Sequence, residues 1–367
     1  MAIRFATVRD AVGGTQMTPH LLQTLDLPSL QNLVVEWGLP KFRAQQIRSW
    51  IVENRAESFD DMANLPKALR GQLAEKAQLW TTQIAKHTTA ADGTEKLLLQ
   101  LHDGGRIECV LLRDGDRRTI CISSQVGCAM GCVFCASGLD GVDRNLTVGE
   151  IIEQMLRLQR LLPVGERLSH IVVMGMGEPL ANIDRLLPAL DFASAEDGLG
   201  ISHRRITIST VGLPPAIRRL ADRDSRYHLA VSLHAPDDEL RNQIVPTNKK
   251  VGIQAILEAA DHYFDVSGRR LTFEYVLLAE LNDRPEHAHR LAKLLRGRPA
   301  LLNIIPYNPV AGLPYRTPSK EAQHEFRAIL ENAGLTVKFR QRKGDKINAA
   351  CGQLRRNTPE NLVQISG

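Results

Sequence analysis

Three cysteines stand close together in a C-x3-C-x2-C pattern, at Cys128, Cys132 and Cys135. Three thiolates within eight residues can surround one metal centre. Structural zinc normally takes four protein ligands, and no fourth Cys or His follows nearby at the usual spacing. A cubane iron–sulfur cluster normally uses one cysteine for each iron, so three cysteines would leave one iron open. The spacing therefore favours a [4Fe–4S] cluster over zinc.

A glycine-rich stretch, Met174-Gly-Met-Gly-Glu-Pro179, follows further along the chain. A lone Gly-x-Gly is typical of a tight turn between a strand and a helix. In a chain that also has the cysteine pattern, it resembles the stretch of radical S-adenosylmethionine enzymes whose backbone meets the methionine amino group. In those enzymes the amine and carboxylate of the cofactor bind the open iron. The resemblance makes Gly177 and Glu178 candidate cofactor-binding residues, with Glu178 opposite the positive ammonium.

Several other residues stand at the ends of successive predicted strands. Their uncharged or switchable polar groups suit ribose hydroxyls and adenine edges. Taken singly, each is better explained as a cap or turn residue, and their repetition at strand ends is what favours a binding role. These candidates are Ser209, Ser232, His234 and Asn308, and Leu233 is included because it lies between Ser232 and His234 at the same strand end.

The elements that must position these residues form a strand–helix alternation that begins near residue 118. Strands are predicted at Arg118–Ser124, His170–Gly175, Arg205–Thr210, His228–Leu233, Leu271–Leu278 and Leu301–Tyr307. Helical patterns separate them at Val148–Leu162, Ile183–Ser194, Pro215–Ala221, Ile253–Phe264 and Glu286–Leu295, and a last helix and strand follow at Lys320–Asn332 and Thr336–Arg342. Such serial β/α units predict a parallel sheet that curls into a partial barrel, with its chemistry at the C-terminal ends of the strands.

The predicted fold class is therefore α/β, a partial (β/α)6 barrel with a small helical N-terminal domain. The N-terminal region has helical spacing at Pro28–Trp37, Phe42–Asn54 and Leu65–Leu79, which indicates a small bundle. The expected divisions are a helical N-terminal domain (1–95), connecting strands (96–117), the barrel (118–343) and a C-terminal loop and tail (344–367).

Composition sets wider limits on the class of protein. The chain has 367 residues, of which 43% are hydrophobic and 24% charged, a balance typical of globular proteins. No apolar run approaches the roughly 20 residues that cross a bilayer, and the N-terminus lacks the pattern of a signal peptide. We therefore expect a cytoplasmic protein without membrane contact. The net charge of +5 permits a nucleic-acid partner without requiring one.

The remaining cysteines lie outside the metal-binding pattern. Cys109 stands in an apolar stretch and is interpreted as a small buried hydrophobic residue. Cys351 lies in Gly344-Asp-Lys-Ile-Asn-Ala-Ala-Cys-Gly352, whose small and polar residues indicate a mobile loop. A basic run precedes it, and charge alone leaves open a solvated face or a phosphate-contacting patch. The run comprises Lys338, Arg340, Arg342, Lys343 and Lys346.

From about residue 20 to its C-terminus, the chain resembles the RlmN/Cfr family of radical S-adenosylmethionine RNA methyltransferases. The ordered set of shared motifs is far more specific than any one of them. These motifs are Phe42-Arg-Ala-Gln-Gln-Ile, Cys121-Ile-Ser-Ser-Gln-Val-Gly-Cys128, Arg144-Asn-Leu146, Gly175-Met-Gly-Glu-Pro179, Ser232-Leu-His-Ala-Pro236, Ile244-Val-Pro-Thr-Asn-Lys-Lys250, Glu274-Tyr-Val276, Glu286-His-Ala-His289 and Ala349-Ala-Cys-Gly-Gln353.

The resemblance implies two thiols outside the cluster. Cys351 would first be methylated by one S-adenosylmethionine, and a radical from a second would take a hydrogen from that methyl group. The resulting carbon radical would add to an adenine ring carbon in 23S ribosomal RNA. Cys121 would then remove the ring proton, and a Cys121–Cys351 disulfide would release the base. Glu108 matches the proton-transfer glutamate of the family, with a strand-edge carboxylate as its alternative.

The resemblance also implies partners and leaves alternatives open. The partners are 23S rRNA, a tRNA adenosine beside the anticodon as a further substrate, and an electron donor such as flavodoxin, and a monomer is expected. Pro179 favours methylation at adenine C2 over C8. Both branches share the catalytic residues, so a C8 methyltransferase that confers antibiotic resistance is the first alternative. A zinc-stabilised RNA-binding protein without catalysis is the second.

Overall fold

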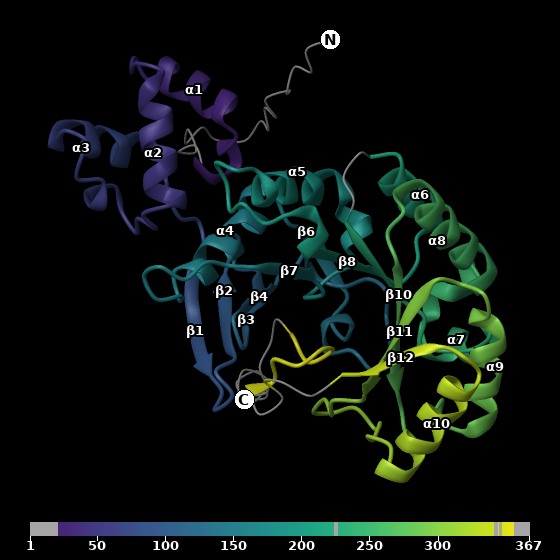
Figure 1. Cartoon of the computed structure of the whole chain (residues 1–367). Helices are drawn as coiled ribbons and strands as arrows, with labels where there is room; N and C mark the ends of the chain where they lie inside the picture. The colour runs from purple at the N-terminus through teal and green to yellow at the C-terminus, as the bar shows by residue number, and fades with distance from the viewer. Residues whose placement is uncertain (1–20, 224–226, 341–343, 345–346, 356–367) are drawn as a thin grey trace.

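The computed structural model describes residues 21–223, 227–340, 344 and 347–355. A small group of helices begins the described chain and lies to one side of the main body (Figure 1). Asp26 caps the first of these α-helices by accepting a hydrogen bond from the Ser29 amide at 2.9 Å, which satisfies an otherwise free amide of the first turn. The elements are η1 (Leu21–Thr24), α1 (Leu27–Glu36), α2 (Phe42–Val52), η2 (Phe59–Asp61) and α3 (Lys67–Lys76).

Four antiparallel strands follow the helices. They are β1 (Gln83–Thr89), β2 (Glu95–Gln100), β3 (Arg106–Asp114) and β4 (Arg117–Cys121), and each pairs with the next. The expectation that residues 1–95 are helical is wrong for 83–89, which form β1. The strand is hard to predict because it lies at the edge of the sheet and most of its residues are exposed, so it lacks the alternation of a half-buried strand. We call strands β1, β2 and β3 the arm.

Strand β4 also begins a run of seven parallel strands, and the whole sheet has ten strands in the order β1-β2-β3-β4-β7-β8-β9-β10-β11-β12. The parallel strands after β4 are β7 (His170–Val173), β8 (Ile206–Thr210), β9 (His228–Ser232), β10 (Leu271–Leu277), β11 (Ala300–Pro306) and β12 (Thr336–Phe339). The helices are α4 (Val148–Gln159), α5 (Ile183–Ser194), α6 (Pro214–Ala221), α7 (Asp238–Ile244), α8 (Ile253–Ser267), α9 (Pro285–Leu295) and α10 (Lys320–Asn332). Several of them cover the outer face of the curved sheet (Figure 1). The predicted α/β partial barrel is confirmed.

Alternation along the strands separates the core from the inside of the barrel. In β8, Ile206 and Ile208 are fully buried in the core, whereas Thr207 and Ser209 line cavities. In β10, Leu271, Phe273 and Tyr275 belong to the core, and the residues between them face the cavities. Because successive side chains of a strand point to opposite faces, the same strands supply both the packing that holds the barrel and the polar lining of its interior.

Helix α4 joins the N-terminal helices to the barrel. A capping box at Thr147 and Glu150 begins the helix. The Glu153 carboxylate accepts hydrogen bonds from the amides and hydroxyls of Thr81 and Thr82 at 2.6–3.1 Å. Nearly every residue of α4 is buried, because the helix lies between the sheet and the N-terminal helices.

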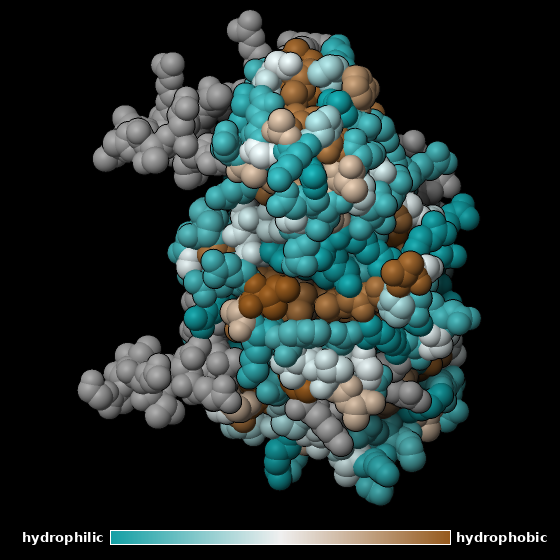
Figure 2. All heavy atoms as spheres, turned by 90° about the vertical axis from the view of Figure 1, so that its left-hand side faces the viewer, coloured by the Kyte–Doolittle hydropathy of each residue, from teal (hydrophilic) through white to brown (hydrophobic). Residues whose placement is uncertain are grey.

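Besides β1, the sequence did not predict helix α7 or the two short strands β5 (Gln125–Gly127) and β6 (Val142–Asn145). These two strands form a hairpin that encloses the three clustered cysteines. Figure 2 views the molecule from the side of β1 and shows a hydrophobic band across a mostly hydrophilic face. Among the described residues, no helix is long and apolar enough to cross a membrane.

Candidate active site

The loop that carries the clustered cysteines, residues 128–141, is closed by the β5–β6 hairpin. We call it the cluster loop. The Cys128 amide donates to the Gly141 carbonyl at 2.8 Å. Gly127 has a φ of +78°, and a Cβ at this position would lie 2.1 Å from the Gly141 oxygen. Only glycine fits here, because an added side chain would collide with backbone and would also require a left-handed conformation.

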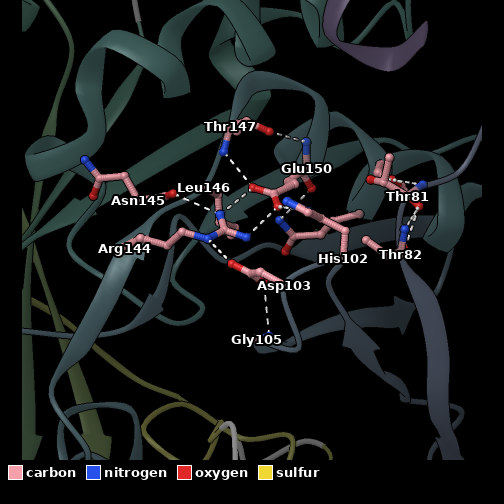
Figure 3. A network of polar contacts seen from close by, with 12 residues as sticks. Thr81, Thr82, His102, Asp103, Gly105, Arg144, Asn145, Leu146, Thr147 and Glu150 are labelled. Carbon is pink, nitrogen blue, oxygen red and sulfur yellow. Dashed lines mark hydrogen bonds and ion pairs between the residues drawn. The ribbon is translucent and has the colours of Figure 1, made fainter. Parts of the chain in front are cut away.

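A polar network fixes the hairpin from outside (Figure 3). Arg144 of β6 donates two hydrogen bonds to Glu150 at 2.8 Å each and one to Asp103 at 2.5 Å. These carboxylates come from the start of α4 and from the turn between β2 and β3. The Arg144 hydrogen bond lowers the pKa of Asp103 to about 2. The cluster loop is thereby attached to two other parts of the fold.

All three thiols of the cluster loop line one cavity of about 140 Å³. Burial raises the pKa of each thiol, that of Cys128 to about 12. Cysteines bind metal as thiolates, so the positive charge of bound iron would have to offset this cost of burial. The donor set of three thiols on one wall fits an iron–sulfur cluster that leaves a position open to a second ligand.

Most of the residues predicted to bind the cofactor line the same cavity. They are Gly177, Glu178, Ser209, Ser232, His234 and Asn308. Gly177 has a φ of +103°, and a Cβ there would lie 2.7 Å from the Gln125 side chain, so glycine is required for this close approach. Leu233 is different, because its side chain is fully buried in the core and its amide donates to the Glu274 carbonyl at 3.0 Å.

Two of these lining residues have defined hydrogen-bonding states. The Glu178 carboxylate accepts from the amides of Leu180 and Val211 at 3.1 and 2.9 Å, and burial raises its pKa. His234 Nδ1 accepts from the Val276 amide at 3.0 Å. Burial, reinforced by the positive charge of Arg241, lowers the pKa of His234 to about 3. His234 therefore presents a neutral ring, and Glu178 is already bound by backbone donors.

Asn308 has the hydrogen-bonding pattern that most clearly fits a ligand-binding role. Its Nδ2 donates to the Cys351 carbonyl at 3.2 Å. Its Oδ1 is buried and has no hydrogen-bond partner among the described residues. Buried acceptors are normally satisfied, so a donor from a bound molecule fits this atom. With the nearby hydroxyls of Ser209 and Ser232, 3.4 Å apart, the cavity offers polar partners suited to S-adenosylmethionine.

A second, larger cavity of about 620 Å³ occupies the inside of the barrel and contains both remaining candidate thiols, Cys121 and Cys351. The two cavities share part of their lining. The shared residues are Met174, Glu274, Ile305, Asn308, Arg340 and Cys351. Cys351 is therefore the one cysteine, among the described residues, that lines both cavities.

Charge in the larger cavity is concentrated near the thiols. Burial raises the pKa of Cys121 to about 12, the nearby Cys351 adds to this, and Arg340 opposes it. The pKa of Arg340 is itself raised by Cys351 and by Glu274. Burial raises the pKa of Glu274, although Arg340 and a 2.7 Å hydrogen bond from Asn303 act against it. The guanidinium of Arg340 thus favours the thiolate form of Cys121.

Glu108 lies apart from these cavities, since neither set of described lining residues includes it. Its carboxylate is buried and forms an ion pair with Lys96 at 2.7 Å. It also accepts from the Arg355 amide at 2.9 Å. Burial raises its pKa, and Lys96 opposes that effect. The role of Glu108 in proton transfer stays a prediction.

Comparison with known proteins identifies the group to which the chain belongs. Residues 122–292 match the family model described as the radical SAM superfamily, and residues 21–79 match the one described as the ribosomal RNA large subunit methyltransferase N-terminal domain. A probable dual-specificity RNA methyltransferase RlmN from Rhodopirellula baltica is 62% identical over 98% of this chain and 97% of its own length. The chain belongs to the RlmN family of radical S-adenosylmethionine RNA methyltransferases.

Further relatives agree with this assignment. A probable RlmN from Symbiobacterium thermophilum is 45% identical over 91% of each chain. The crystal structure of a radical SAM methyltransferase from Sphaerobacter thermophilus matches with a TM-score of 0.89 and 42% identity, over 92% of this chain and all of that one. The cofactors of this RlmN-family enzyme are a [4Fe–4S] cluster and S-adenosylmethionine. Family membership, together with the thiol-lined cavity, decides between the cluster and zinc.

Sequence reasoning missed two polar residues in the barrel of this RlmN-family enzyme. Glu274 and Asn303 interrupt the apolar strands Leu-Thr-Phe-Glu-Tyr-Val-Leu and Ala-Leu-Leu-Asn-Ile-Ile-Pro. A charged or amide group inside a buried strand is costly unless it has a partner or a function, and this signal could have found both. Of the predicted basic run, Lys338 and Arg340 line the larger cavity, whereas Arg342, Lys343 and Lys346 lie outside the described residues.

Proposed function

We propose that this enzyme methylates carbon C2 of an adenosine in RNA, with the methyl group carried on Cys351. The observation that carries the proposal is the position of Cys351. This residue lines both the cofactor cavity and the larger cavity that contains Cys121. A carrier must reach a donor and an acceptor in turn, and a residue shared by two cavities meets that requirement. Similar proteins bear the name dual-specificity RNA methyltransferase, which supports 23S rRNA and tRNA as substrates.

In this proposal the smaller cavity holds the cofactors. Cys128, Cys132 and Cys135 ligate the cluster, and the polar wall of the cavity holds S-adenosylmethionine. That wall comprises Gly177, Glu178, Ser209, Ser232, His234 and Asn308. When bound, the cluster and S-adenosylmethionine supply the methyl group and the one-electron chemistry that activates it. An ordinary methyl transfer would fail, because adenine C2 is not nucleophilic.

The chain itself performs the remaining tasks in the larger cavity. Cys351 presents its methyl group to the adenine ring, and Cys121 takes the proton from C2. Burial keeps Cys121 a neutral thiol at rest, and the guanidinium of Arg340 favours the thiolate needed to accept that proton. The Cys121 thiolate then attacks the Cys351 sulfur, so that an S–S bond forms while the bond from that sulfur to the transferred carbon breaks. The carbon keeps the electron pair and takes a proton to become the methyl group of the product, and the two thiols are left oxidised by two electrons. An electron donor such as flavodoxin restores them.

Glu108 and the N-terminal region complete the proposal. Glu108 serves in proton transfer, supported by its raised pKa. The helical part of residues 1–95 contacts RNA, supported by its match to a ribosomal RNA methyltransferase N-terminal domain and by Arg43, whose guanidinium lies 4.8 Å from the centre of the exposed Phe42 ring. The enzyme acts as a monomer in the cytoplasm.

One reconstitution tests the proposal. The cluster is loaded anaerobically, and the enzyme is incubated with a reductant, methyl-deuterated S-adenosylmethionine and a 23S rRNA fragment. We expect deuterated 2-methyladenosine and 5′-deoxyadenosine by mass spectrometry, and loss of the methylated base in Cys351→Ala. Formation of 8-methyladenosine would contradict the C2 assignment. An enzyme that carries its cluster yet methylates neither rRNA nor tRNA would contradict the choice of substrate.

A further inference from the structure

The loop that carries Cys351 is held from three sides. We call its described residues, 344 and 347–355, the Cys351 loop. On the side of the cluster loop, the Ala136 amide donates to the Gly352 carbonyl at 2.8 Å and the Ser137 hydroxyl to the Leu354 carbonyl at 2.7 Å. On the side of β11, Asn308 Nδ2 donates to the Cys351 carbonyl. The third side is the arm, and its contacts are different in kind.

Every hydrogen bond described here between the arm and the Cys351 loop uses a side chain of the arm. The Asp92 carboxylate, in the β1–β2 turn, accepts from the Gly344 amide at 3.0 Å. Lys96 Nζ donates to the Asn348 carbonyl at 3.0 Å. The Glu108 carboxylate accepts from the Arg355 amide at 2.9 Å.

Lys96 is central to these contacts because it acts at two places at once. Its Nζ lies 2.7 Å from Glu108 Oε1 in addition to its bond to Asn348, and its side chain is only 10% exposed. The two loop positions that it controls, Asn348 directly and Arg355 through Glu108, stand three residues before and four residues after Cys351. One ammonium group therefore contacts the segment around the thiol on one side of Cys351 directly and on the other side through Glu108.

We propose that Lys96 is a positioning residue that holds Cys351 where its two cavities meet. The inference rests on the proposed role of Cys351 as methyl carrier. Without the ammonium group, the Asn348 carbonyl loses its donor, and the buried Glu108 carboxylate loses the ion-pair partner that fixes its position. A carboxylate that is no longer held in place is a poorer acceptor for the Arg355 amide. Both tethers from the β2–β3 strands weaken together, and the thiol samples positions away from the cavities.

A simpler explanation is that Lys96 only stabilises the sheet through its pair with Glu108 on the next strand. The neighbouring residue provides a matched control. Glu95 is as buried as Lys96, at 8% exposure for each residue. Its carboxylate pairs with Arg113 and His87, both on the arm. Because successive strand residues point to opposite faces, Glu95→Gln removes an ion pair of the arm without removing a contact to the Cys351 loop.

Hydrogen–deuterium exchange of the full chain, read by mass spectrometry of peptides, measures the tethers directly and requires no catalysis. In Lys96→Met we expect exchange in peptides from 347–355 to rise at least about tenfold, the effect of losing hydrogen bonds to charged groups. Lys96→Arg, which keeps the charge and the donors, restores protection, and Glu95→Gln leaves these peptides unchanged. Lys96→Gln serves as a second neutral variant if Lys96→Met folds poorly.

Activity provides the second readout. For Lys96→Met we expect kcat for RNA methylation to fall about tenfold with KM for RNA unchanged, since the carrier and not the RNA surface is disturbed. Unchanged exchange in 347–355, or equal acceleration in Lys96→Met and Glu95→Gln, would overturn the proposal. If the unmodified enzyme protects the loop but methylates no adenosine, the proposed function fails while the tether stands.

Discussion

Two loops with candidate functional cysteines, the cluster loop and the Cys351 loop, meet at the candidate active site and are held in different ways. The cluster loop is bound largely through backbone: Cys128 to Gly141 at its ends, and Val133 to the Ile244 carbonyl at 3.1 Å near its middle. The Cys351 loop depends more on side chains, above all Lys96 and Asn308. Metal ligands must keep one geometry, whereas a carrier must change position.

The contrast has a physical basis. Releasing a backbone-paired loop requires the loss of regular structure at its base, here the β5–β6 hairpin. Releasing a loop held by side chains requires only rotamer changes in those side chains, which are faster and cost less. In the proposed roles, Cys351 can therefore move while the cysteines proposed to ligate the cluster keep their hairpin, once the single backbone bond from Ala136 to Gly352 opens.

The largest expected difference between the two loops is in iron content after one cysteine is removed from each. Cys132→Ala should lose cluster iron and, with it, all RNA methylation, because a ligand of the metal is missing. Cys351→Ala should keep its iron and sulfide content, still cleave S-adenosylmethionine, and yet form no methylated adenosine. Iron analysis and nucleoside mass spectrometry distinguish the two. Loss of iron in both variants would mean that the loops are not separate in function.

Cys121→Ala tests whether the proposed carrier, Cys351, needs a second thiol to release its product. Cys351 should still be methylated and should still attack the base, but no thiol remains to take the ring proton and release the product. We expect a covalent protein–RNA adduct that denaturing gels reveal, with turnover reduced about a thousandfold or more, as for loss of a nucleophile or base. Cys109→Ala is the control, since Cys109 is fully buried and lines neither cavity among the described residues. Free methylated RNA from Cys121→Ala would refute the adduct.

Gly127→Ala tests whether the cluster loop must be rigid. The added Cβ would meet the Gly141 oxygen and would require a left-handed backbone, with an expected cost of about 3 kcal/mol in folding stability or an equivalent opening of the hairpin. Iron occupancy should fall at least about tenfold. Gly141→Ala is the matched control, because it has a φ of +69° but open space around its Cβ position. Equal iron content in both variants would show that the collision is relieved elsewhere.

The comparison also explains what the sequence could predict. The three cysteines and the barrel strands were predictable, because metal-ligand spacing and strand–helix alternation are local patterns. The β5–β6 hairpin was not, because it has only three or four residues a side and little apolar alternation. The contact between Lys96 and Asn348 was equally hidden. It joins residues 252 positions apart, and nothing local in either segment indicates the other.

Glu178 shows a different limit. A glutamate after Gly-x-Gly suggests an ion pair with the methionine ammonium, yet the carboxylate already accepts two backbone hydrogen bonds. The residue type shows that a carboxylate is present, but not how many of its oxygen lone pairs already accept hydrogen bonds from the protein. For Asn308 the reverse holds, since an ordinary amide after a strand turns out to carry an unsatisfied buried oxygen.

Arg144→Met probes the outer support of the cluster loop. The variant leaves Glu150 buried without its guanidinium partner, at a cost of about 3 kcal/mol, and loosens the hairpin from the arm. Arg144 lowers the pKa of Asp103 to about 2, so stability from that pair is present above the ordinary pKa of 3.8 and is lost as pH falls toward 2. The difference in Tm between wild type and variant should therefore shrink from pH 5 to pH 2. A constant difference would exclude a part for the Asp103 charge.

Asn308 lines both cavities, and its substitution has the smallest expected effect but provides the most specific test. Asn308→Ala removes both the acceptor for the cofactor and the donor to Cys351, so we expect about fivefold to tenfold weaker S-adenosylmethionine binding, the effect of one buried hydrogen bond. Asn308→Asp keeps an acceptor oxygen but cannot donate to the Cys351 carbonyl while ionised.

The two substitutions therefore separate the functions of one side chain. For Asn308→Asp we expect affinity for S-adenosylmethionine close to that of the wild type, with faster hydrogen exchange in the Cys351 loop. Asn308→Ala should show both defects. Equilibrium binding of S-adenosylmethionine and peptide exchange measure them independently. If Asn308→Asp binds the cofactor as weakly as Asn308→Ala does, the unsatisfied oxygen is not the atom that the cofactor uses, and Asn308 belongs with the tethers of the carrier alone.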